Sequence, residues 1–289
     1  MSQIKILVTN QKGGVGKSTI SANLAGYLAL EKKLSVSFID FDKQSTSYNL
    51  IKKYSEHQIQ PHKGGLIYQQ NSNLTLLEAR SIMRTRSGQS DVLIADLTWT
   101  FGLPDTFLLD FDIIVVPSSN SILEVASTEI FLLEYYQKNS IKFNQKRQYL
   151  IVTPSRIDAD NLSNLEFAGL RFIETCSISP VVYRIPNINE FITKGFLCRS
   201  ENPVVSENFL ELGDFVHQKI VEKITESQAS KREEIVNKSI DRRNYESYYK
   251  GTSQVDNASR VRPVVPSKIE NTQKNSLLDL IPAFLRKNK

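Results

Sequence analysis

Apolar and polar positions follow two different patterns along this chain. Short runs rich in Val, Ile and Leu predict strands at Ile4–Thr9, Val36–Asp40, Leu74–Leu77, Val92–Asp96, Ile113–Pro117, Tyr149–Thr153 and Val181–Ile185. Longer segments with apolar residues at helical spacing predict helices at Lys17–Leu30, Ser121–Lys138, Asn161–Thr175 and Ser206–Ile224. The alternation of the two predicts an α/β fold, with a doubly wound, mostly parallel sheet flanked by helices.

The pattern changes near Ser227. Residues 227–274 are rich in Ser, Asn, Lys, Arg and Glu and contain Pro263 and Pro266, so we expect a flexible, basic linker. The last residues, 275–289, read NSLLDLIPAFLRKNK and combine apolar positions at helical spacing with a basic end. The sequence therefore predicts a domain over 1–226, the linker, and a short amphipathic C-terminal segment.

The charge is concentrated in that tail. The net charge is +5, and Thr225 to Lys289 holds 13 Lys or Arg against 8 Asp or Glu, which accounts for the whole excess. The two cysteines, Cys176 and Cys198, form no CxxC pair, which argues against a disulfide framework or a cysteine-ligated metal. The first residues enter a strand without a secretory pattern, and no apolar run is long enough to span a bilayer. We expect a cytoplasmic protein.

A glycine-rich loop lies between the first predicted strand and the first predicted helix. It reads KGGVGKST and contains Gly13, Gly14, Val15, Gly16, Lys17, Ser18 and Thr19. A loop of this composition in this position is typical of a phosphate-binding P-loop, because its backbone N–H groups and the helix N-terminus face the phosphates. Lys17 would reach the β- and γ-phosphates of ATP, Ser18 would ligate Mg²⁺, and Thr19 would donate to the α-phosphate.

The extra lysine at position 12 makes the loop more specific. KGGVGKST resembles the deviant Walker A box of the ParA/MinD family of positioning ATPases. The resemblance implies a homodimer that forms around two ATP molecules, with Lys12 reaching the phosphates bound by the other subunit. A cation between two polyanionic nucleotides relieves their repulsion, so ATP would hold the dimer together.

Three aspartates extend the resemblance. Asp40-Phe41-Asp42-Lys43-Gln44 is similar to the family's DxDPQ box, with Lys43 in place of proline, and implies that Asp40 supports Mg²⁺ and Asp42 orients the attacking water. Asp96 ends an apolar strand and resembles the Walker B aspartate that holds the Mg²⁺ water shell. The family usually continues as DxPP, whereas this chain reads Asp96-Leu97-Thr98-Trp99, so the shape of that loop is in question.

By analogy with the family, the base of ATP lies after the strands that end at Thr153 and Ile185. The candidates there are Arg156, Arg184, Pro186 and Asn187, and Arg184-Ile185-Pro186-Asn187 resembles the family's IPxN loop. Ordinary strand-end turns would explain these residues equally well.

Non-specific DNA binding is a further implication of the resemblance. The candidate residues are Lys194, Arg199, Lys219 and Lys223, with Lys231 and Arg232 just beyond. Phosphate contacts of this kind weaken steeply with salt. The alternative is a solvated helix face, because Glu207, Glu211 and Glu222 dilute the same region.

The C-terminal segment and a tyrosine cluster leave other functions open. The segment 275–289 could lie on an anionic membrane, as in a MinD-like ATPase, or dock onto a protein. Tyr245, Tyr248 and Tyr249 are compatible with a bacterial tyrosine kinase, although the P-loops of those kinases lack KGGV. Iron-cluster relatives are set aside because this chain lacks paired cysteines. The sequence thus favours a ParA-type ATPase, associated with the nucleoid or peripherally with membrane, that segregates or positions DNA or a protein cargo with a ParB-like partner that stimulates hydrolysis.

Overall fold

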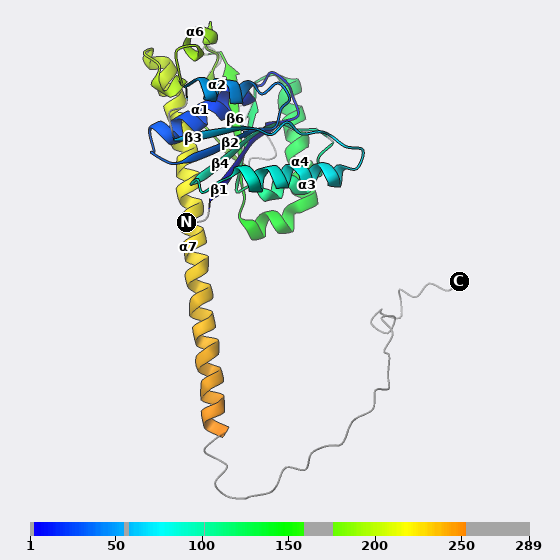
Figure 1. Cartoon of the computed structure of the whole chain (residues 1–289), viewed down its shortest axis with the longest axis vertical. Helices are drawn as coiled ribbons and strands as arrows, with labels where there is room; N and C mark the ends of the chain where they lie inside the picture. The colour runs from blue at the N-terminus through cyan, green and yellow to red at the C-terminus, as the bar shows by residue number, and fades with distance from the viewer. Residues whose placement is uncertain (1–2, 55–57, 101, 159–175, 253–289) are drawn as a thin grey trace, which may run out of the picture. The chain divides into compact units, whose positions relative to one another are not determined.

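The computed structural model describes residues 3–54, 58–100, 102–158 and 176–252; the side chains of 231 and 233–252 are outside this description. The chain divides into two units, Met1–Lys231 and Arg232–Lys289. The first unit contains the sheet and its covering helices, and the described part of the second is helical (Figure 1).

The first unit is built on a parallel sheet with β1 at its centre. The strands are β1 (Ile4–Asn10), β2 (Val36–Asp40), β3 (Ile59–Lys63), β4 (Val92–Thr98), β5 (Ile113–Ser118), β6 (Tyr149–Ile157), β7 (Ser177–Ile178) and β8 (Val182–Tyr183). Their order is β3-β2-β4-β1-β5-β6-β7, and β8 pairs with β6. Because β1 pairs with β4 on one side and β5 on the other, the loop after β1 lies at the point where the order reverses. Ligands of open α/β sheets bind at such a point.

Helices cover both faces of the sheet, as the apolar strands require. They are α1 (Lys17–Leu30), α2 (Thr46–Tyr54), α3 (Ser72–Arg86), α4 (Ile122–Lys146), α6 (Ile188–Ile192) and α7 (Pro203–Thr252), with 3₁₀ helices at Asp105–Asp110 and Leu197–Arg199. Alternate residues of β1 serve the two layers: Ile6 and Val8 pack with α1 and the start of α7, and Leu7 packs with α3 and α4. The predicted α/β fold with a parallel sheet is confirmed.

Most predicted elements near the glycine-rich loop are present. The helix Lys17–Leu30 and the strands that became β1, β2, β4, β5 and β6 lie where the apolar runs placed them, and the strand predicted at Val181–Ile185 shortens to β8. The strand predicted at Leu74–Leu77 is wrong, because those residues lie in α3. Asn71 caps that helix by accepting a bond from the backbone N–H of Asn73 at 3.0 Å, and the buried Leu76, Ala79 and Met83 follow helical spacing.

The last described helix is longer than predicted. Helix α7 continues from Pro203 to Thr252, past Ser227, where the sequence predicted the start of a flexible linker. No Gly or Pro occurs from Asp214 to Lys250, so no residue in that stretch interrupts a helix, although it lacks an apolar stripe. The helix predicted at Asn161–Thr175 and the segment 275–289 lie outside the described residues. Among the described helices, none is long and apolar enough to cross a membrane.

Candidate functional site

The loop between β1 and α1 has the backbone geometry of a phosphate cradle. Gly14 and Gly16 adopt positive φ angles of 77° and 90°, which side chains rarely tolerate. Asn10 anchors the start of the loop, because its side-chain oxygen accepts from the backbone N–H of Lys12 at 3.0 Å. Ser155 anchors the middle, since its hydroxyl donates to the carbonyl of Val15 at 2.7 Å. The loop is thus fixed from its own strand and from β6.

Lys17 is held inside the loop with its charge poorly solvated. The residue is only 6% exposed, and its Nζ donates to the carbonyl of Lys12 at 2.7 Å. Burial lowers the pKa of Lys17 below its ordinary value, and the nearby carboxylates of Asp96 and Asp42 oppose that shift. A buried ammonium ion with incomplete compensation is a strong site for an added anion.

An open cavity of about 590 Å³ lies beside this lysine. The residues that line it are Gly13, Gly14, Gly16, Lys17, Ser18, Thr19, Asp42, Lys43, Gln44, Thr46 and Thr98. Lys12 is exposed and is not among them. The cavity therefore joins the glycine-rich loop to the box after β2 and to the end of β4, as the order of the strands requires.

Asp40 connects this site to helix α2. Its carboxylate accepts from the Ser47 hydroxyl at 2.6 Å, from the backbone N–H of Tyr48 at 3.0 Å and from the backbone N–H of Asp42 at 3.0 Å. Burial raises the pKa of Asp40, and these hydrogen bonds oppose the increase. A carboxylate at the first turn of a helix also benefits from the helix dipole. Asp40 is therefore a positioning residue that fixes the start of α2.

Asp42 lines the cavity, and its carboxylate is held by Thr98, for which the sequence predicted no role. Thr98 donates to the Asp42 carboxylate twice, from its backbone N–H at 3.0 Å and from its hydroxyl at 2.8 Å. Only the departure from the DxPP pattern at Thr98 could have pointed to this residue.

Asp96 is the buried acid of the site. It is fully buried, and neither carboxylate oxygen has a hydrogen-bond partner within the described residues. Burial, with Asp40 and then Asp42 as nearby negative charges, raises the pKa of Asp96 to about 7, and the hydroxyls of Ser47 and Ser18 partly offset this. Two unpartnered buried oxygens are costly unless a cation neutralises them.

These donors fit a Mg²⁺ ion. Ser18 lies in the cavity lining, and Asp96 and Asp40 lie close enough to each other for their charges to interact. Within the described residues, no three His, Cys, Asp or Glu side chains form a complete metal cage. Mg²⁺ keeps several waters and uses one or two protein oxygens together with phosphate oxygens, so Ser18 and the two aspartates would suffice to hold it.

The four candidates for base recognition do not line this cavity. Arg156, at a left-handed φ of 57°, ion-pairs with Glu124 at 3.3 Å, and its guanidinium lies 3.9 Å from where a Cβ on Gly14 would be. Arg184 ion-pairs with Asp158 at 2.9 Å, and Asn187 precedes α6. Arg156 thus lies beside the phosphate loop, and the backbone N–H of Arg184 donates to the carbonyl of Ile157, the residue after Arg156, at 2.8 Å; base recognition by these residues stays a prediction.

The four DNA candidates have different environments. Lys223 is 9% exposed, and its ammonium donates to the carbonyls of Lys146 and Arg147, so its charge is engaged inside the fold, which does not favour a contact with DNA. Lys219 pairs with Glu222 at 2.8 Å, and Arg199 pairs with Glu31 at 2.8 Å. Lys194 is exposed.

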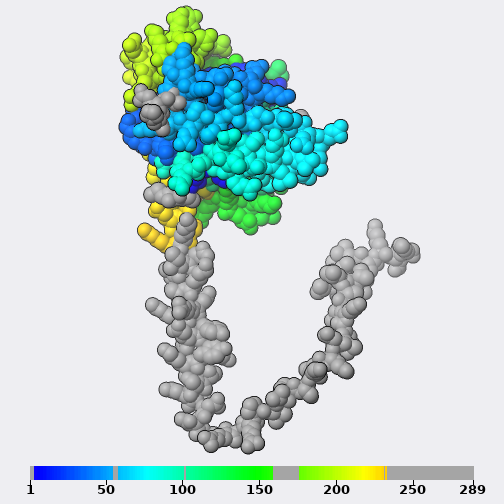
Figure 2. Space-filling model, viewed as in Figure 1, coloured from blue at the N-terminus to red at the C-terminus, as the bar shows by residue number. Residues whose placement is uncertain are grey.

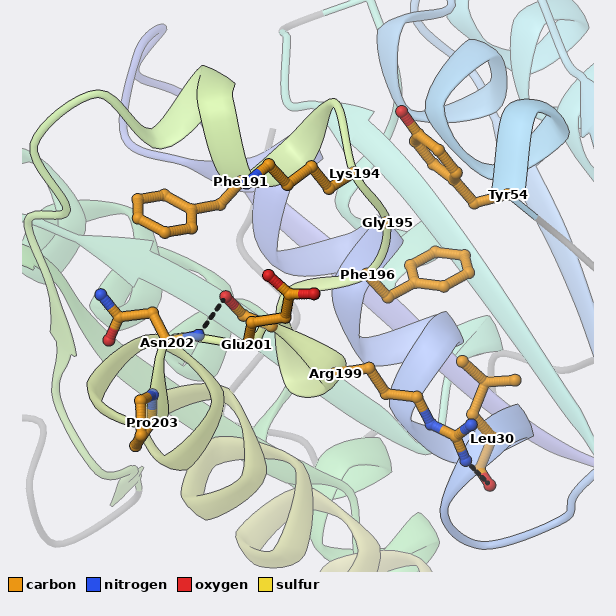
Figure 3. Close-up of a pocket in the computed structure, with 11 residues that line it drawn as sticks. Leu30, Tyr54, Phe191, Lys194, Gly195, Phe196, Arg199, Glu201, Asn202 and Pro203 are labelled. Atoms are coloured by element: carbon orange, nitrogen blue, oxygen red, sulfur yellow. Dashed lines mark hydrogen bonds between the residues drawn. The ribbon is translucent and has the colours of Figure 1, made fainter.

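A larger cavity, of about 710 Å³, lies apart from the glycine-rich loop (Figure 3). Side chains of α1, α2 and the segment before α7 line it, among them Leu30, Tyr54, Phe191 and Phe196. No residue of the glycine-rich loop and none of the three aspartates takes part. We therefore place the chemistry in the smaller cavity, where a buried lysine and acids meet a phosphate cradle.

The fold and this site define a P-loop nucleotide-binding protein. The sequence model of the family described as the CobQ/CobB/MinD/ParA nucleotide binding domain matches residues 6–280, and the chain belongs to this family. The predicted resemblance to ParA and MinD is thereby confirmed. No protein of curated function matches the sequence significantly.

Solved structures share the fold at low sequence identity. McdA from Cyanothece in complex with ATP is 19% identical, with 76% of this chain and 97% of that chain covered and a TM-score of 0.58. MinD from Aquifex aeolicus, in its complex with MinC, is 14% identical, with 75% and 96% covered and a TM-score of 0.56. A candidate plasmid partition protein from Borrelia burgdorferi bound to AMPPNP is 17% identical, with 75% and 100% covered and a TM-score of 0.52.

Proposed function

We propose that this protein is a ParA-type ATPase, which pairs two copies over two molecules of ATP, hydrolyses ATP slowly to ADP and phosphate, and segregates or positions DNA. The observation that carries the proposal is the arrangement of buried Lys17 and unpartnered Asp96 beside a glycine-rich loop with positive φ angles. Lys17 forms no ion pair within the described residues and is poorly solvated, and the Asp96 oxygens accept no hydrogen bond there; a triphosphate would bind the lysine, and Mg²⁺ would neutralise the acid.

Each residue of the site has a separate role in this proposal. The N–H groups of Gly13 to Thr19 and the ammonium of Lys17 bind and orient the phosphates. Asp42, which Thr98 holds with two hydrogen bonds, would accept a hydrogen bond from the attacking water and so orient it. Mg²⁺, held through Ser18 and water bound to Asp96 and Asp40, would neutralise charge that develops on the phosphates.

Lys12 is assigned to the partner's nucleotide. Its backbone is fixed on both sides, by Asn10 at the N–H and by Lys17 at the carbonyl. Its side chain is exposed, makes no ion pair within the described residues, and does not line its own cavity. A cation presented outward from a rigid loop is suited to bind a phosphate on a second copy.

Calorimetric titration of ATP with Mg²⁺ tests the assignment of the site. Lys17→Ala should weaken binding by at least about 100-fold, equivalent to about 2.7 kcal/mol, because it removes a desolvated charge aimed at the phosphates. Lys142→Ala, an exposed lysine on α4, is the control and should bind as wild type. Undiminished affinity in Lys17→Ala would refute the site.

A further inference from the structure

An aromatic ring on α2 lies between two lysines. The Nζ of Lys63, on edge strand β3, is 5.0 Å from the ring centroid of Tyr48, and the Nζ of Lys52, on α2, is 5.8 Å from it. Both lysines are exposed. Ammonium groups at these distances are attracted by the ring face, so the tyrosine holds two positive charges together at the surface.

A second tyrosine extends this surface toward α6. Lys53 Nζ lies 4.9 Å from the ring centroid of Tyr54, whose hydroxyl donates to the carbonyl of Thr193. The next residue is the exposed Lys194, and Tyr54 and Lys194 both border the larger cavity (Figure 3). We call Tyr48, Lys52, Lys53, Lys63 and Lys194 the α2–β3 basic surface. The space-filling view shows α2, in blue, on the face toward the viewer (Figure 2).

The lysines of α2 and β3 have few acidic neighbours in their own stretch of sequence, and Glu201 is the acid that lines the larger cavity together with Lys194. From Lys43 to Leu77 the sequence has four lysines, and Glu56 is its one acidic residue. Within the described residues, none of the lysines of the α2–β3 basic surface forms an ion pair, whereas Arg199 and Lys219 do. A local excess of unpaired lysines with interleaved tyrosines is the composition of a surface that binds a polyanion.

The apolar residues of the same elements face inward. Ile51 and Ile59 are at most 5% exposed, and Leu50 packs against the core. Binding in a bilayer interface needs an apolar face buried among the lipids, and α2 does not present one. The surface therefore favours the phosphates of a nucleic acid over a membrane.

The surface is also connected to the nucleotide site. The backbone N–H of Tyr48 and the hydroxyl of Ser47 both bond to the Asp40 carboxylate, and Thr46 lines the phosphate cavity. A change at Asp40 would therefore act directly on the first turn of the helix that carries Lys52 and Lys53. This contact gives ATP a physical route to alter the surface.

We propose that the α2–β3 basic surface binds the backbone of double-stranded DNA without sequence preference in the ATP-bound state. The proposal rests on the proposed function and identifies where its DNA partner binds. It replaces Lys219 and Lys223 as the principal cations and retains Lys194. Lysines contact phosphates as point charges and read no base edges, which accords with non-specific binding.

Fluorescence anisotropy with a random-sequence duplex, ATP and Mg²⁺ tests the proposal in the full chain. Lys52→Ala/Lys63→Ala should weaken DNA binding by at least about tenfold at 0.1 M salt. The plot of log K against log salt has a negative slope, and its steepness should decrease by about two because two phosphate contacts are lost. The control is Arg84→Ala/Lys142→Ala, which removes equal charge from exposed positions on α3 and α4 and should bind as wild type. Lys52→Arg/Lys63→Arg should also retain binding, and all variants should keep the ATP affinity of wild type.

Each alternative result has a definite meaning. If wild type binds DNA and the double alanine variant binds equally well, the surface is refuted while the proposed function stands. If wild type binds anionic phosphatidylserine vesicles instead of DNA and the alanine variant loses that binding, the surface contacts membrane and the DNA proposal is overturned. If wild type binds neither, this inference and the DNA part of the proposed function both fail, and ATP titration of Lys17→Ala still judges the nucleotide site.

Discussion

Thr98 donates two hydrogen bonds to the carboxylate of Asp42, one from its backbone N–H at 3.0 Å and one from its hydroxyl at 2.8 Å. The residue stands two positions after Asp96, where the DxPP pattern of the family has its first proline. A proline has no N–H to donate and no hydroxyl, so neither bond could form. In this chain a threonine therefore fixes the acid that we assign to the attacking water.

Thr98→Val should lower kcat by about tenfold and leave KM for ATP almost unchanged. The variant keeps the backbone bond and the side-chain shape, but it removes one hydrogen bond to a charged group, which contributes about 1.5–3 kcal/mol. Steady-state phosphate release measures both constants. Thr98→Ser keeps the hydroxyl and should retain most of the wild-type kcat. An increased kcat in Thr98→Val would instead show that the hydrogen bond from the Thr98 hydroxyl holds Asp42 away from the attacking water.

Asp96→Asn should stabilise the protein at high pH in the absence of Mg²⁺ and nucleotide. The pKa of Asp96 is about 7 in the folded protein against 3.8 for the free side chain, so the folded state binds the proton more tightly. Wild type therefore loses stability as the pH rises from about 4 to 7, whereas the neutral asparagine does not. The advantage of the variant should grow across this window, to at most about 4 kcal/mol by pH 8.

Urea denaturation at pH 5 and pH 8 measures that difference. Glu190→Gln, which removes an exposed acid on α6, should shift both midpoints equally little. An Asp96→Asn variant that is no more stable than wild type at pH 8 would mean that the Asp96 carboxylate has a partner in the free protein.

Lys223→Met should destabilise the fold and leave DNA binding intact. The buried ammonium donates to the carbonyls of Lys146 and Arg147 at the end of α4, and methionine keeps the stem but not the donor. The loss should be about 1–3 kcal/mol in the free energy of unfolding. Lys219→Met, on the same helix, removes an 18% exposed side chain that pairs with Glu222 and lies over the rings of Tyr149 and Phe215; because no buried carbonyl is left without its donor, it should cost less than Lys223→Met, about 1 kcal/mol. A weakened DNA affinity in Lys223→Met at full folding would return this lysine to the DNA surface.

The centre of the fold was predictable because its strands are buried on both faces. The runs Ile6–Val8 and Val92–Ala95 are apolar throughout, and Gly16-Lys17 marks the start of α1 in the sequence itself. The secondary structure of Leu74–Leu77 could not be predicted from these four residues, because a short, mostly apolar run is compatible with a strand or a helix. Its helical state depends on the cap at Asn71 and on Met83, twelve residues after that cap.

The sequence could not show which lysines are free. Lys223 and Lys52 both lie in charged helical segments, and the sequence does not distinguish them. In the structure Lys223 donates to the carbonyl of Arg147 at the end of α4, 76 residues earlier in the chain, whereas Lys52 is exposed beside Tyr48. Strand β3, Ile59–Lys63, was not predicted; it contains Pro61, which a strand tolerates at the edge of a sheet.

The central claim is that two copies pair over ATP because each contributes a lysine to the other's phosphates. Sedimentation velocity of wild type and Lys12→Ala with Mg²⁺ and AMPPNP tests it most directly. Wild type should sediment as a dimer with nucleotide and as a monomer without it, while Lys12→Ala should bind AMPPNP within about threefold of wild type, about 0.65 kcal/mol, yet stay a monomer. A Lys12→Ala variant that dimerises as well as wild type with AMPPNP would contradict the account.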